Sequence, residues 1–90
     1  MIIDYQDRPI RLTEERRAHI LGHPEMKDIE AGLVETLRNP ALVIQSLADP
    51  SAELSYRYFL GTRVGDKWLC VIVKHSPGDA FVLTAYLTDK

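Results

Sequence analysis

Three stretches in the second half of the chain decide the fold: Leu54–Leu60 (LSYRYFL), Leu69–His75 (LCVIVKH) and Phe81–Thr88 (FVLTAYLT). Successive side chains in a β-strand point to opposite faces, so each stretch can be divided into two sets of alternate residues. We expect the more apolar sets to share one buried face. Those sets are Leu54, Tyr56, Tyr58 and Leu60; Leu69, Val71 and Val73; and Phe81, Leu83, Ala85 and Leu87.

The opposite face of the same strands is predicted to mix apolar residues with cations and hydroxyls: Arg57, Phe59, Cys70, Ile72, Lys74, Val82, Thr84, Tyr86 and Thr88. A face that is only solvated would not be expected to combine cations and hydroxyls with apolar residues, so we take this face as the leading candidate for a functional site. The alternative is that Arg57 and Lys74 lie there only because antiparallel sheets commonly leave one face in water.

Working outward, Leu42–Leu47 (LVIQSL) is predicted to be a further strand, preceding the three above. The links 61–66 and 76–79 are short enough for hairpins, which predicts an antiparallel meander. Met1–Asp4 and Ile10–Leu12 suggest an extended segment at the N-terminus.

Two helices are predicted upstream of the sheet. Thr13 is a suitable N-cap, and Gly22 can end the first helix in the left-handed conformation. A second helix is expected from about Asp28 to Asn39-Pro40, with an apolar stripe of Ile29, Leu33, Val34 and Leu37. The predicted fold is therefore α+β, with two N-terminal helices packed on a roughly four-stranded antiparallel sheet and covering its apolar face.

Size and composition predict a single domain spanning residues 1–90. No apolar run approaches the ~20 residues of a membrane span, the N-terminus lacks the order of a secretion signal, and Cys70 is the single cysteine. We therefore expect a cytoplasmic protein with no membrane partner. The net charge of −2 argues against a protein that coats nucleic acid, although residues 53–90 carry five Lys/Arg against four Asp/Glu.

His19 and His23 are the candidate proton-transfer groups, because the pKa of an unperturbed histidine lies near neutrality. They are four residues apart, which would suit two zinc ligands on a helix, but a third ligand is absent from the pattern, so no metal site is expected. The alternative is that they are helix-end histidines bonded to carbonyls or water. Cys70 lacks an identifiable base and is interpreted as a small buried hydrophobic residue.

Several motifs resemble a known family. The runs RLTEERRAHILGHPEM, ETLRNP, YRYF, WLCVIVK and FVLTAYLTDK, over about residues 9–89, resemble the small bacterial and phage-associated nuclease-like domains of the BECR group, named for barnase, EndoU, the colicin nucleases and RelE. The resemblance implies a metal-independent endoribonuclease or a toxin–antitoxin toxin. It places the site residues at His19, His23, Arg57, Lys74 and Thr84. The acidic net charge and the position of Lys90 directly after the last strand depart from the family's pattern.

The leading hypothesis is an endoribonuclease in which a ribose 2′-OH attacks the adjacent phosphate without a metal or other cofactor. His19 or His23 would transfer protons, Arg57 and Lys74 would stabilise the phosphorane charge, and Thr84 or Tyr86 would position the phosphate. RNA and a cognate antitoxin protein are the expected partners.

The alternative hypothesis is a non-catalytic module of the same fold that binds a protein or a second copy of itself through the same face or an edge strand. A histidine clustered with Arg57 and Lys74 in a cleft would favour the enzyme, whereas a flat apolar patch would favour the module. Tyr56 and Tyr58 would stack on RNA bases only if their face were open, and we expect that face to be covered by the second helix.

Overall fold

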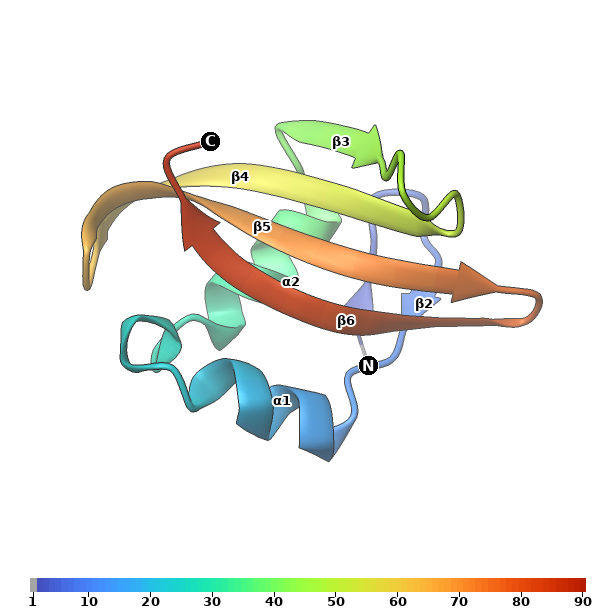
Figure 1. The fold of residues 1–90 in the computed structure, drawn as a ribbon, viewed down its shortest axis with the longest axis horizontal. Helices are drawn as coiled ribbons and strands as arrows, with labels where there is room; N and C mark the ends of the chain where they lie inside the picture. Colours follow the sequence, from blue (N-terminus) through green and yellow to red (C-terminus); the bar gives the residue numbers. More distant parts are fainter. Residues whose placement is uncertain (1) are drawn as a thin grey trace.

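The four main strands form one antiparallel meander with two helices on one side of it (Figure 1). The computed structural model describes residues 2–90, so Met1 of the predicted N-terminal segment lies outside the described residues. The first half of the chain forms β1 (Ile2–Ile3), β2 (Pro9–Ile10), α1 (Glu14–Leu21), the 3-10 turn η1 (Pro24–Met26) and α2 (Glu30–Arg38). The second half forms β3 (Leu42–Gln45), β4 (Ala52–Thr62), β5 (Gly65–Ser76) and β6 (Asp79–Thr88), paired in the order β3-β4-β5-β6. The predicted α+β fold is confirmed.

Helix α1 begins as its sequence predicts. Thr13 has an extended backbone, and its hydroxyl oxygen accepts a hydrogen bond from the Arg16 amide at 3.2 Å. This contact satisfies one of the unpaired amide groups of the first turn. The expectation of a left-handed Gly22 is wrong, because its φ of −71° is right-handed and the chain turns through His23 directly into η1.

The core lies between the helices and one face of the sheet. Helix α2 lies behind the sheet in Figure 1, and α1 runs along its β6 edge. The core unites residues from every layer: Ile2, Ile10, Ile20, Met26, Ile29, Leu33, Leu37, Leu69, Val71, Val73, Ala80, Val82 and Ala85. Thr36, which is fully buried on α2, donates its hydroxyl to the Gly32 carbonyl at 2.7 Å, so its own buried donor is satisfied.

The predicted face of β4 is wrong. Arg57 lies opposite Leu69, which is fully buried, whereas Tyr56 lies opposite Cys70 and Tyr58 opposite Trp68. Paired residues of an antiparallel sheet project to the same face. Leu54, Tyr56 and Tyr58 therefore lie on the face away from the helices, while Arg57 and Phe59 lie on the helix side.

The predicted face of β6 is correct only for its second half. Ala85 and Leu87 pair with Val71 and Leu69 on the helix side, as expected. A bulge follows toward the start of β6, because Thr84 pairs with Ile72 but Val82 pairs with Val73, which leaves Leu83 as an extra residue. An extra residue reverses the alternation. Val82 is therefore fully buried in the core, and Phe81 lies on the face away from the helices.

Candidate functional site: the open face of the sheet

The face of the sheet that the helices leave uncovered is the candidate site, and we call it the open face. Figure 1 turns it toward the viewer, in front of α2. Register and alternation place fourteen side chains on it: Leu42 and Ile44 of β3; Ala52, Leu54, Tyr56 and Tyr58 of β4; Trp68, Cys70, Ile72 and Lys74 of β5; and Phe81, Thr84, Tyr86 and Thr88 of β6.

The open face is apolar and aromatic at its surface. Four of its large side chains are substantially exposed: Leu42 at 37%, Ile44 at 39%, Tyr86 at 40% and Tyr58 at 48%. Tyr58 also packs edge-on against Trp68, with ring centroids 5.3 Å apart. A patch of exposed apolar side chains, drawn here from three strands of one sheet, is typical of a surface that binds another molecule.

The centre of the open face is a row of three paired residues, Tyr56, Cys70 and Tyr86. Cys70 is completely buried, and this burial raises the pKa of its thiol. A side-chain hydrogen bond with Cys70 is the largest cause that raises the pKa of Tyr86 to about 12, and partial burial is the second. At neutral pH both groups stay protonated. Cys70 is therefore no nucleophile, and Tyr86 can donate a hydrogen bond but cannot act as a base.

Lys74 is the cation of the open face, and it is neutralised. Its ammonium group donates a hydrogen bond to Asp49 in the turn between β3 and β4. The bond from Lys74 is the largest cause that lowers the pKa of Asp49 to about 2, and Ser51 adds two further bonds. At neutral pH the pair carries no net charge. Lys90 approaches the same face from the C-terminus, with its ammonium 5.4 Å from the Tyr56 ring centroid.

Arg57 lies on the other side of the sheet from Lys74. Its Nη1 donates to the Asn39 carbonyl at 2.7 Å, and its Nη2 is 3.8 Å from Glu35 Oε1. Both partners belong to the last turn of α2, where a cation is favoured by the carbonyl dipoles. Arg57 thus ties the C-terminus of α2 to β4. The expectation that Arg57 and Lys74 share a face is wrong.

The two histidines lie together but apart from the predicted phosphate-binding residues. His19 of α1 and His23 before η1 are exposed, with ring centroids 5.6 Å apart in an edge-to-face arrangement. Helix α1 packs on β6, at the opposite edge of the sheet from β3 and on the helix side. Within residues 2–90, no group of three His, Cys, Asp or Glu side chains is placed to hold a metal ion.

Of the six predicted site residues, the structure gathers Lys74, Thr84 and Tyr86 on one face and separates them from Arg57, His19 and His23. Sequence reasoning missed Trp68 and the two tyrosines of β4 as members of this face. The signal that could have found them is the tyrosine-rich alternation of β4, because tyrosine tolerates a surface with one polar end better than a sealed core does.

Comparisons of the chain with known protein families, with curated proteins and with solved structures find no match. None of the helices described in residues 2–90 is long and apolar enough to cross a membrane.

Proposed function

We propose that this chain is a protein-binding module that pairs with a second copy of itself through the open face. One observation carries the proposal: the open face exposes aromatic and aliphatic side chains from β3, β4 and β6, while Lys74 is already neutralised by Asp49. Protein interfaces are depleted in charge at their centre and enriched in Tyr and Trp.

A second copy suits the open face better than a charged partner. Each chain carries a net charge of −2, so two copies repel weakly unless their contacting surfaces are neutral. The strands of the open face meet that condition, because Lys74 is paired with Asp49. In a two-fold dimer the same patch serves both subunits, and two four-stranded sheets packed face to face, at the usual spacing of about 10 Å, would bury their aromatic side chains between them.

The test is the oligomeric state of two matched variants. Tyr58→Arg adds a positive charge to the open face of each subunit, within the proposed dimer contact, and it should raise the dissociation constant about tenfold or more, as loss of an interface aromatic anchor does. The control is Leu47→Arg, which adds the same charge at a fully exposed turn residue outside the open face. Sedimentation equilibrium measures both, and the emission of Trp68, the single tryptophan, should shift to shorter wavelength on association.

A monomeric wild-type protein at high micromolar concentration would contradict the dimer. Equal weakening by Tyr58→Arg and Leu47→Arg would contradict the assignment of the contact to the open face.

RNA is the second candidate partner, because Lys74, Thr84 and Tyr86 lie on the same face as Tyr58 and Trp68. Open four-stranded sheets with exposed aromatic side chains can stack unpaired bases. This arrangement favours single-stranded RNA as the ligand, and the ribonuclease or toxin activity implied by the BECR resemblance belongs to this candidate. Cleavage, if it occurs in excess EDTA, should depend on Lys74 and survive Arg57→Ala, since Arg57 lies on the helix side.

A further inference from the structure

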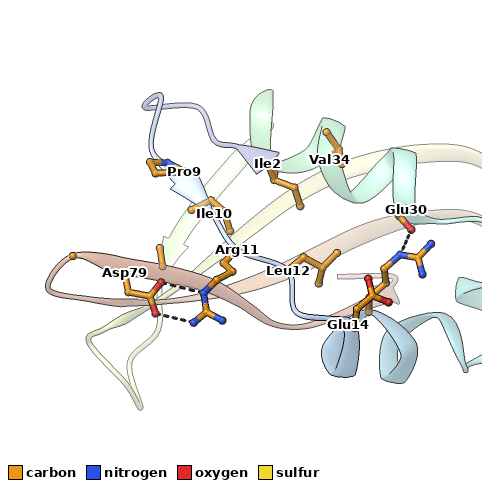
Figure 2. Close-up of a pocket in the computed structure, with 12 residues that line it drawn as sticks. Ile2, Pro9, Ile10, Arg11, Leu12, Glu14, Glu30, Val34 and Asp79 are labelled. Carbon is orange, nitrogen blue, oxygen red and sulfur yellow. Dashed lines mark hydrogen bonds and ion pairs between the residues drawn. The ribbon is translucent and has the colours of Figure 1, made fainter.

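A hollow of about 520 Å³ lies at the end of the molecule where the β1–β2 pair meets both helices (Figure 2). The N-terminal segment forms one wall with Ile2, Ile10 and Leu12, and the outward side of α2 contributes Glu30 and Val34. The turn between β5 and β6 closes a third side through 78–80. None of these residues belongs to the open face. The size falls within the range of sites that hold small organic molecules.

The floor of the hollow is apolar. Figure 2 shows Ile2, Ile10, Leu12 and Val34 directed toward a common space. Ile10 is almost fully buried beneath it, whereas Val34 remains 40% exposed although it lies on the same helix as the core residues Leu33 and Leu37. A ligand that covered Val34 would remove apolar surface from water and gain free energy in proportion to its own apolar area.

Two ion pairs border the hollow, and each is complete. Arg11 donates through Nε and Nη2 to the two oxygens of Asp79 at 3.3 and 2.8 Å, drawn as two dashed lines in Figure 2. The hydrogen bonding from Arg11 lowers the pKa of the Asp79 carboxyl. Arg17 donates through Nε to Glu30 at 2.7 Å. Both arginines therefore carry their own counter-charge and offer little attraction to an anion.

Glu14 supplies the remaining charge. The lining contains two arginines and three carboxylates, a net charge of −1. Among residues 2–90, the Glu14 carboxylate has neither a hydrogen-bond donor nor an ion-pair partner, and it is exposed at the rim. The hollow thus combines an apolar floor with one carboxylate that has no ion-pair partner among the described residues.

We propose that this hollow binds a small amphipathic cation, a molecule with an aliphatic or aromatic body and one ammonium group. The body lies on Ile10, Leu12 and Val34, and the ammonium group pairs with Glu14. Affinity comes mainly from the apolar contact, and the charge decides between otherwise similar ligands.

The test compares three probes of equal length: n-hexylamine, 1-hexanol and hexanoate. Titrations followed by NMR should rank their affinities as amine, then alcohol, then carboxylate, with shifts centred on the amides of Leu12, Val34 and Ala80. From butylamine to hexylamine the affinity should rise about fourfold per methylene group, the factor expected for burying one.

Two variants locate the site. Glu14→Gln should weaken hexylamine binding about two- to fivefold, the range of an exposed ion pair, and leave 1-hexanol unchanged. Glu15→Gln is the matched control, since it neutralises the next residue of the same helical turn, which does not line the hollow. Val34→Phe should occupy part of the apolar floor of the hollow and weaken all three probes. The proposal is overturned if hexanoate binds as tightly as hexylamine, if Glu15→Gln acts like Glu14→Gln, or if the shifts centre elsewhere.

Discussion

At the scale of single residues, the ion pair of Lys74 with Asp49 controls the charge of the open face. The folded-state pKa of Asp49, about 2, lies below its ordinary value of 3.8. A carboxyl whose pKa is lowered by folding adds stability above the ordinary value, and that contribution is lost as the pH falls from about 3.8 to about 2. Below about pH 2 the Asp49 carboxyl is mostly protonated, and Lys74 becomes an uncompensated cation on an apolar surface.

We predict that Lys74→Met raises the pKa of Asp49 part of the way toward 3.8. The recovery is partial because the Ser51 amide and hydroxyl continue to donate to Asp49 at 3.0 and 2.6 Å. Carbon-13 NMR titration of the Asp49 carboxyl measures the change, and the Asp79 carboxyl, held by Arg11, serves as the internal control. An unchanged Asp49 titration would show that Ser51, not Lys74, sets its pKa.

At the scale of elements, one close approach sets how α2 packs on β4. A side chain added at Gly32 of α2 would place its Cβ 3.3 Å from Phe59 Cζ on β4, closer than ordinary contact. Glycine inside a helix costs about 1 kcal/mol relative to alanine. Glycine at position 32 therefore lowers the helix propensity of α2, but it lets the helix contact the half-buried Phe59 ring closely.

We predict that Gly32→Ala stabilises the wild-type protein by less than the gain in helix propensity, because the new methyl group crowds Phe59. In a Phe59→Leu background, where the crowding is removed, the same substitution should give the full gain of about 1 kcal/mol. Urea denaturation of the four proteins of this double-mutant cycle gives the coupling free energy. The reference for intrinsic propensity is Ala31→Gly at the neighbouring exposed position, which should cost about 1 kcal/mol. A zero coupling energy would contradict the crowding of Gly32 by Phe59.

At the scale of the whole molecule, salt separates the two candidate partners of the open face. Apolar association is strengthened by sulfate, which is excluded from protein surfaces, whereas RNA binding weakens as salt displaces phosphate contacts. We predict that sodium sulfate lowers the dimer dissociation constant measured by sedimentation. Binding of a fluorescent single-stranded RNA that weakens steeply with sodium chloride, without dimer formation, would instead favour the RNA candidate and the endoribonuclease hypothesis.

Local sequence patterns were sufficient for the order of the two helices and the four main strands. The capping of α1 by Thr13, the apolar stripe of α2 and the alternation of the strands each depend on neighbours a few residues apart, so the order of helices and strands and the meander were predictable. Strands β4, β5 and β6 are a few residues longer than predicted, because pairing with a neighbour can continue beyond the alternating stretch, whereas β3 ends at Gln45, two residues earlier than predicted.

The candidate site was less predictable, because it depends on which faces of different strands coincide. On β5 both faces are apolar, with Cys70 and Ile72 on one and Val71 and Val73 on the other, so its sequence does not indicate how β4 is aligned with it. The bulge at Leu83 likewise cannot be predicted from the sequence of β6 alone, because it is defined by the pairing with β5.

The sequence by itself determined an α+β protein with two helices followed by an antiparallel meander, and it placed Lys74, Thr84 and Tyr86 in strands. Only the tertiary structure decided that Tyr58 and Trp68 join them on the open face, and that Arg57 lies behind it at the end of α2. The physical reason is the two-residue period of a strand. A shift of one residue in register exchanges its two faces, and register is set by packing between distant segments.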